Sequence, residues 1–229
     1  ADGADLDVPQ YLDFVRAERA YRGSPQWMAD RDYFVENYRD IEPALYSRGG
    51  PVRGRRRRHH AMRVNPAIAQ RIRDAGRSIF AVTAVAIGEY LRRVHRREDI
   101  VIGVPFLNRT SEAELRTVGC MTNILPMRIP VDGALSATQR ADRLSAQVWE
   151  LQARQRFAYG DIVTALQEAG RPGPTLFDVT YSYLTLPDGE QNQWIWKDAA
   201  VLASGYTLDA VNIVVRDYER DGALEVDLF

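Results

Sequence analysis

The sequence contains few of the residue types that build covalent cross-links and metal sites. Its 229 residues include one cysteine and three histidines. A single cysteine, Cys120, excludes an intramolecular disulfide and a cysteine-rich metal site, and it fits a reducing, cytoplasmic compartment. The three histidines show no His-x-x-x-His spacing and have no cysteine partner nearby, so they do not form a zinc-binding pattern. We therefore expect no bound metal.

Long apolar runs and an excess of one charge are missing as well. The longest apolar runs, 81–87 and 100–104, are far too short to span a bilayer, so we expect no membrane partner. Basic and acidic residues number 30 and 31, for a net charge of −1, so no overall field favours nucleic acid. The first ten residues contain no basic region, no apolar region and no initiator methionine. We expect the chain to be cut from a longer protein.

Hydrophobic periodicity, turn residues and capping residues predict interleaved helices and strands. Capping residues support three of the helices: Ser24 and Pro25 at the start of the second, Ser78 before the fourth, and a capping box of Ser136 and Gln139 at the fifth. The predicted helices are 11–21, 25–40, 66–75, 79–95, 136–156 and 161–169, and the predicted strands are 56–64, 99–106, 120–129, 176–184, 208–218 and 223–229.

Three of these segments indicate how the elements pack. In helix 79–95 an apolar stripe runs from Phe80 to Val94 and is widened by Val82 and Val85, which predicts deep burial. Strand 99–106 is continuously apolar, as in strands that are covered on both faces. In the last strand, apolar residues alternate with Glu225 and Asp227. We find no internal repeat, and the pattern predicts an α/β fold with a mixed sheet covered by helices.

Five stretches, taken together, resemble the condensation domains of non-ribosomal peptide synthetases, which belong to the chloramphenicol acetyltransferase-like superfamily. They are YLDFV (11–15), IVIGVPFLNR (100–109), VGCMTNILPMR (118–128), QARQRFAYGDIV (152–163) and GRPGPTLFDVTYSY (170–183). In the third stretch Gly119, Asn123 and Arg128 match the family pattern, whereas Met121 and Ile124 replace its usual Phe and Thr. The fourth lacks the usual His and Pro-Phe, and the fifth has Thr175 where Pro is usual.

All five stretches match the second half of the family's domain, which is built from two similar lobes. The resemblance therefore implies that residues 1–229 are the C-terminal half, one chloramphenicol acetyltransferase-like lobe without the N-terminal lobe. In the family the His-His-x-x-x-Asp-Gly motif precedes the Tyr-x-Asp motif, and only ten residues precede Tyr11 here. The family also continues past its last strand into a further helix, and this sequence stops at Phe229.

A histidine pair at His59 and His60 imitates the catalytic motif. Counted from His59, the aspartate and glycine positions hold Val64 and Asn65, and neither residue can replace them: valine cannot form the ion pair, and asparagine tolerates the glycine geometry less well. The pair also lies after Tyr11 instead of before it. We interpret the two histidines as polar residues at one end of a strand, and we expect no catalytic residue in this chain.

Four residues are candidates for the wall of the substrate tunnel that the resemblance implies: Asn108, Arg109, Asn123 and Arg128. An amide and a guanidinium within an apolar strand require partners. One interpretation is that Asn123 and Arg128 hold loops together through hydrogen bonds. The other, implied by the resemblance, is that Asn123 lies near the tunnel between the lobes. The sequence leaves both open.

Three other features have ordinary structural interpretations. Arg55–Arg58 could contact phosphates, but a solvated or ion-paired strand edge is expected because no aromatic residues interleave. Cys120 lies in an apolar, strand-like run, so we expect a small buried side chain and not a nucleophile. Trp194 and Trp196 have strand-like spacing and suit either core packing or a face that meets the other lobe.

The resemblance implies a function in amide formation. In the family an amine acceptor attacks an acyl donor, and both are thioesters on the phosphopantetheine arms of carrier proteins. The resemblance therefore implies no directly bound cofactor. The implied partners are peptidyl and aminoacyl carrier proteins and the missing N-terminal lobe. The alternatives are a non-catalytic module that binds carrier proteins or other enzymes, a nucleic-acid binder that uses Arg53–Arg58, and an epimerisation or cyclisation relative. Asn123 within TNILPMR favours condensation over that relative.

Overall fold

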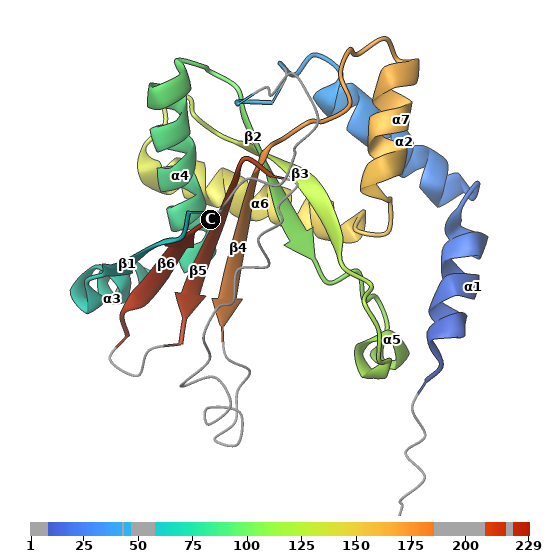
Figure 1. The fold of residues 1–229 in the computed structure, drawn as a ribbon, viewed down its shortest axis with the longest axis horizontal. Coiled ribbons are helices and arrows are strands. Elements are labelled where there is room, and N and C mark those ends of the chain that lie inside the picture. The colour runs from blue at the N-terminus through green and yellow to red at the C-terminus, as the bar shows by residue number, and fades with distance from the viewer. Residues whose placement is uncertain (1–8, 43, 47–57, 186–208, 219–221) are drawn as a thin grey trace, which may run out of the picture. The chain divides into compact units, whose positions relative to one another are not determined.

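The computed structural model describes residues 9–42, 44–46, 58–185, 209–218 and 222–229 (Figure 1). The chain forms two compact units. Unit 1 comprises residues 1–40, 105–125 and 150–174, and unit 2 comprises 41–104, 126–149 and 175–229. The helices are α1 (Tyr11–Tyr21), α2 (Pro25–Tyr38), α3 (Pro66–Asp74), α4 (Ile79–His95), α5 (Glu112–Arg116), α6 (Ala137–Ala153) and α7 (Tyr159–Glu168), and the strands are β1 (His60–Val64), β2 (Ile100–Phe106), β3 (Asn123–Ile129), β4 (Val179–Thr185), β5 (Val211–Asp217) and β6 (Leu224–Leu228).

The strands form one six-stranded sheet in the order β1-β6-β5-β4-β2-β3. Strand β4 pairs in parallel with both β5 and β2, whereas β6 pairs antiparallel with both β5 and β1. Figure 1 shows β1, β6, β5 and β4 side by side. The α/β fold with a mixed sheet and helices, predicted from the alternation of apolar segments, is therefore confirmed.

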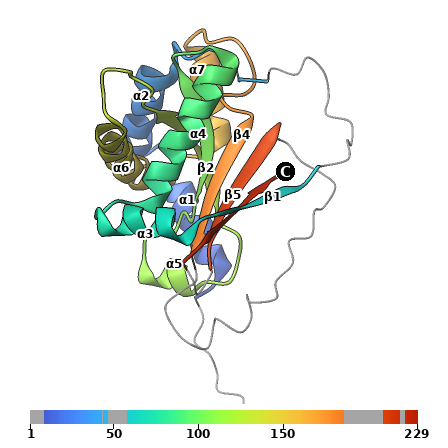
Figure 2. The ribbon, with the colours of Figure 1, turned by 90° about the vertical axis from the view of Figure 1, so that its left-hand side faces the viewer.

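Helix α4 of unit 2 lies against one face of this sheet (Figure 2). It begins at Ser78, whose side-chain oxygen accepts a hydrogen bond from the N–H of Ala81, as the sequence predicted. A Cβ at Gly88 would lie 2.2 Å from the side chain of Ile129. The helix can therefore pack this closely against β3 because Gly88 has no side chain. The hydroxyls of Thr83 and Tyr181 lie 2.6 Å apart and join the helix to β4.

The core of unit 2 surrounds β2. All residues from Ile100 to Val104 are buried, which confirms the prediction of a strand that is covered on both faces. A Cβ at Gly103 would lie 2.3 Å from the ring of Phe177. Any larger residue at this position would push that ring out of the core, because packed interiors leave no spare volume.

The stripe predicted along α4 is only partly correct. Ala84 and Leu91 are buried as expected, but Val94 is 53% exposed at the end of the helix. Val82 is only partly buried. An apolar stripe identifies one face of a helix but not which neighbours cover it, and here part of the apolar surface of α4 faces a groove that is described below.

Unit 1 packs α2 and α7 around an aromatic cluster. Phe34 on α2 stacks on Phe157, with ring centroids 5.6 Å apart, and Trp27 lies 5.3 Å from the same ring. Phe34 and Phe157 are fully buried. Beside them the hydroxyl of Tyr21 donates a 2.6 Å hydrogen bond to the buried carboxylate of Asp30. Burial, together with this carboxylate, raises the pKa of Tyr21.

Capping residues located the helix starts better than the helix ends. Ser24 accepts from the N–H of Trp27, and Ser136 and Gln139 form the predicted capping box through hydrogen bonds of 2.9 and 3.2 Å. Helix α1 has the predicted bounds, whereas α2, α3 and α6 end one to three residues early. Helix α5 was missed, although Ser111 followed by Glu114 is the pattern of a capping box.

None of the helices described here has both the length and the apolar character that crossing a bilayer would require.

A buried carboxylate lies at the antiparallel edge of the sheet. Asp227 on β6 is fully buried, although it is a charged residue that alternates with apolar residues along the strand. Its Oδ1 lies 2.7 Å from Nε2 of His59, and its Oδ2 lies 2.6 Å from the guanidinium of Arg216. The same guanidinium lies 3.0 Å from the more exposed carboxylate of Glu225. The contact with His59 and the charge of Arg216 thus offset the burial of Asp227.

We expect Asp227→Asn to lower the free energy of unfolding by about 3 kcal/mol, because the guanidinium of Arg216 loses its buried counter-charge. Glu225→Gln, which removes a partly exposed partner of the same guanidinium, should cost less than about 1 kcal/mol. Urea unfolding followed by circular dichroism measures both variants. Equal costs for the two variants would contradict the structural role that we give to Asp227.

Candidate functional site

The segment that follows β2 in unit 1 begins with a strained asparagine. Asn108 has a φ of 54°, in the left-handed region that asparagine tolerates better than most residues. Its N–H donates a 2.8 Å hydrogen bond to the side-chain carbonyl of Gln155, and both residues are buried. The Oδ1 of Asn108 is also buried, and no described group donates to it.

Arg109 organises the turn around α5. Its guanidinium donates to the main-chain carbonyl of Glu114, and also to those of Thr117 and Gly119 at 2.8 Å each. A planar fork with five N–H donors can bind several carbonyl groups at once. Within unit 1 Arg109 therefore works as a clamp on its own loop.

Glu114 joins this loop to the segment after α6. Its carboxylate accepts hydrogen bonds from the N–H and the hydroxyl of Thr110, at 2.6 and 3.0 Å, and from Arg156 at 2.6 Å. Burial alone would raise the pKa of Glu114, but the hydrogen bonds from Thr110 and Arg156 outweigh burial and lower it. A charged carboxylate is thus held among its donors at neutral pH.

Asn123, the first residue of β3, holds the segment between α6 and α7. Its side-chain NH₂ donates to the carbonyls of Gln155 and Phe157, at 2.9 and 2.8 Å, and its Oδ1 accepts from the N–H of Tyr159 at 3.2 Å. Both amide hydrogens and the amide oxygen are engaged. These contacts support the interpretation that Asn123 holds loops together.

Cys120 differs from the prediction. It is exposed, and it precedes β3 instead of lying within it. The reason lies next to it: Gly119 has a φ of 153°, and a Cβ there would lie 2.4 Å from the ring of Tyr11 on α1. The Tyr11 hydroxyl donates a 3.0 Å hydrogen bond to the carbonyl of Cys120. This contact holds the chain outside the strand until Asn123. The apolar run therefore predicted a strand that begins three residues too early.

A hollow of about 210 Å³ brings two of the four predicted tunnel residues together. Asn108 and Asn123 line it with Tyr11, Cys120 and Arg156, among others. One guanidinium nitrogen of Arg156 is buried without a partner, as is Oδ1 of Asn108. Two side chains at the hollow therefore retain hydrogen-bonding capacity that the described residues do not use.

The other two predicted residues lie elsewhere. Arg109 does not line the hollow and contacts the carbonyls of its own loop. Arg128 belongs to unit 2, where its guanidinium lies 2.6 Å from the carboxylate of Asp99 and half of its side chain is exposed. The tunnel role of all four residues stays a prediction.

The three histidines all belong to unit 2, and none lines the hollow. His59 binds Asp227 and stacks on Phe229, with centroids 4.7 Å apart. His60 is exposed, and the ring of His95 contacts Tyr46. Arg58 is exposed, whereas Arg53–Arg57, Trp194 and Trp196 lie outside the described residues. Among the residues that the structure describes, no cluster of three His, Cys, Asp or Glu could hold a metal ion.

We expect Asn123→Asp to destabilise the chain by about 2 kcal/mol, because a carboxylate cannot donate to the carbonyls of Gln155 and Phe157. Thr122→Ala, at the exposed neighbouring position, should change stability by less than about 0.5 kcal/mol. Chemical unfolding of both variants provides the comparison. A neutral Asn123→Asp would mean that these hydrogen bonds contribute nothing to the fold.

The lowered pKa of Glu114 predicts a loss of stability in acid. Its contribution is fully present above the ordinary carboxyl value of 4.5 and is lost as the pH falls below that value toward the lower pKa of the folded chain. Glu114→Gln should therefore be less stable than the wild type at pH 7 and should lose less stability on acidification. Unfolding measured from pH 7 to pH 3 gives both curves, and parallel curves would contradict the prediction.

Comparison with known proteins identifies related sequences and folds. A family model described as the condensation domain matches residues 3–219. Enterobactin synthase component F of Escherichia coli (strain K12) is 25% identical over 94% of this chain and 17% of that protein. The dimodular nonribosomal peptide synthase of Bacillus subtilis (strain 168) is 23% identical over 66% of this chain and 6% of that protein.

Solved structures show the same fold. The first condensation domain of the CDA synthetase superposes with a TM-score of 0.75 at 20% identity, over 99% of this chain and 50% of that one. The starter condensation domain of rhizomide synthetase gives a TM-score of 0.68 at 17% identity, over 100% and 51%. The chain thus spans about half of these structures and less than a fifth of the two curated relatives. Because the family model matches nearly its whole length, the chain belongs to the condensation domain family.

Proposed function

We propose that this chain is the C-terminal lobe of a condensation domain that forms an amide between a carrier-bound acyl donor and a carrier-bound amine acceptor. The main support is that the family model covers residues 3–219 while the chain spans about half of the solved condensation domains. Its partners would be peptidyl and aminoacyl carrier proteins and the N-terminal lobe. The lobe binds no cofactor directly, because its substrates arrive on phosphopantetheine arms.

Exposed apolar side chains in unit 1 support a surface that meets another protein part. Val118 is 81% exposed, and Leu12, Leu107 and Leu115 are each more than half exposed. Leu107, Leu115 and Val118 all belong to the loop that Arg109 and Glu114 hold in place. Several exposed apolar residues on an ordered segment are typical of a protein interface. We assign this surface to the N-terminal lobe.

The hollow with Asn108 and Asn123 supports a place for the substrate arm. Asn108 and Arg156 line it, and an amide and a guanidinium side chain suit amide groups chemically. A phosphopantetheine arm contains amide groups. Asn123 and Gln155 would position Asn108 and not react themselves, since their side chains are engaged with the loops.

In this proposal the N-terminal lobe supplies the group that transfers the proton. Amide formation transfers the acyl group from sulfur to nitrogen: the amine nitrogen bonds to the thioester carbon, the carbon–sulfur bond breaks, and the amine proton must leave. A general base typically supplies roughly 10²–10⁴-fold of the rate. None of the three histidines lines the hollow, so this chain would supply binding and positioning only.

We expect the purified chain, incubated with aminoacyl and peptidyl carrier proteins, to form no amide product detectable by mass spectrometry. The lobe encoded upstream, added as a separate chain, should restore product, and its histidine-to-alanine variant should not. Turnover by the 229-residue chain alone would refute the proposal. An upstream sequence without the His-His-x-x-x-Asp-Gly motif would favour a non-catalytic carrier-binding module instead.

A further inference from the structure

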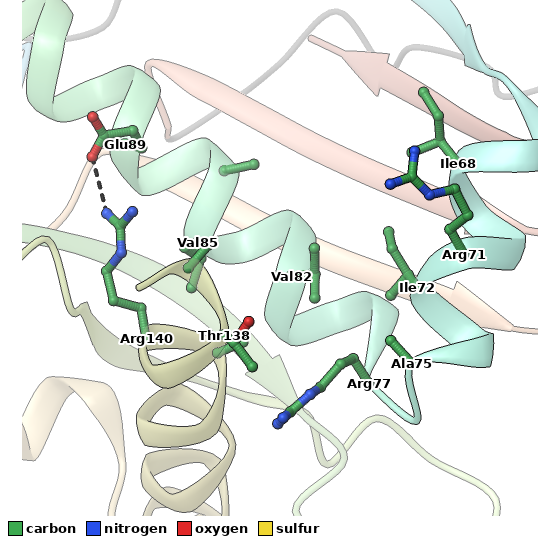
Figure 3. Close-up of a pocket in the computed structure, with 13 residues that line it drawn as sticks. Ile68, Arg71, Ile72, Ala75, Arg77, Val82, Val85, Glu89, Thr138 and Arg140 are labelled. Carbon is green, nitrogen blue, oxygen red and sulfur yellow. Dashed lines mark hydrogen bonds and ion pairs between the residues drawn. The ribbon is translucent and has the colours of Figure 1, made fainter. Parts of the chain in front are cut away.

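A groove of about 590 Å³ lies on the helical side of unit 2, between α3, α4 and the start of α6 (Figure 3). Its floor is the outer face of α4, with Val82, Val85 and Ala86. The wall on α3 contains Ile68 and Ile72, and the wall on α6 contains alanines. Its volume falls within the roughly 300–1,000 Å³ range of small-molecule sites. None of its lining residues belongs to unit 1.

Ion pairs hold the walls of the groove in place. Arg140 on α6 lies 3.1 Å from Glu89 on α4, as the dashed line in Figure 3 shows. Arg77, in the turn between α3 and α4, pairs with Asp142 on α6. Hydrogen bonds from Arg92 and from Arg140 lower the pKa of Glu89 to about 2, so Glu89 is charged at neutral pH. These arginines are therefore neutralised by carboxylates of the protein itself.

Arg71 is the exception. It lines the groove from α3 and is exposed, and among the described residues no carboxylate pairs with it. The groove thus combines an aliphatic interior with one cation at its rim that is available to an anion. Among the described residues that line it, none is aromatic, and Thr138 has the only uncharged polar side chain. An aliphatic chain with an acidic head group would complement such a lining, because apolar side chains contact the chain and the guanidinium offsets the negative charge.

We propose that the groove binds a free saturated fatty acid, with its chain along α4 and its carboxylate on Arg71. The floor from Val82 to Glu89 covers eight residues and therefore seven helical rises, or roughly 10 Å. That length suits a medium aliphatic chain. A partner helix is itself about 10 Å wide, so it would contact only about two turns of α4. This inference goes beyond the proposed condensation function and does not depend on it.

The experiment titrates the 229-residue chain with octanoate, decanoate and dodecanoate below their micelle concentrations, by isothermal titration calorimetry. Each added methylene should tighten binding, by about fourfold where it is fully buried. Arg71→Gln should weaken decanoate about tenfold and leave decanol unchanged, because only the carboxylate meets the guanidinium. Arg143→Gln, an exposed arginine of α6 that does not line the groove, should change neither ligand.

Filling the groove tests its location. Ala86→Trp on the exposed floor of α4 should abolish decanoate binding. Ala153→Trp, at the exposed last residue of α6, should not. Ala137→Phe on the α6 wall is a second obstruction should Ala86→Trp fail to fold by circular dichroism. Absence of decanoate binding to the wild type overturns the proposal, as does decanoate binding that survives both obstructions. Equal affinity for decanol and decanoate would overturn the assignment of the carboxylate to Arg71.

Discussion

The constraint on which the structure depends is that main-chain polar groups in its irregular segments must find partners. Asn123 meets three of them with one side chain, and Arg109 meets three more. Gln155 supplies a side-chain acceptor to Asn108 and a main-chain acceptor to Asn123. Because a buried unpaired group costs about 1–3 kcal/mol, these few side chains determine where the loops lie.

The same solution appears in unit 2, where Asp178 accepts from the N–H groups of Leu45 and Tyr46. A polar residue within an apolar segment suggests a functional site. In this chain such residues often form hydrogen bonds that stabilise loops instead. Asn108 and Asn123 lie together at the hollow because both are fixed by Gln155.

Local patterns predicted most of the fold, because capping residues and periodicity act within a few residues of the chain. Ser78 and Ser136 identified their helices, and the apolar run of β2 indicated its burial. The error at Cys120 and the burial of Asp227 have another origin, since each depends on a partner distant in sequence. For Cys120 that partner is Tyr11, and for Asp227 it is Arg216 and His59. The motifs identified the family. Only the coordinates show that Asn123 holds a loop of unit 1, whereas Arg128 pairs with Asp99 in unit 2.

The lone thiol has a practical consequence. Cys120 is the single cysteine of the sequence, it is exposed, and it borders the hollow with Asn108 and Asn123. A maleimide dye would attach at this one position, and no other cysteine would first have to be removed by mutation. Its fluorescence would then report directly on whatever enters or covers this part of unit 1, in the unaltered chain and in real time.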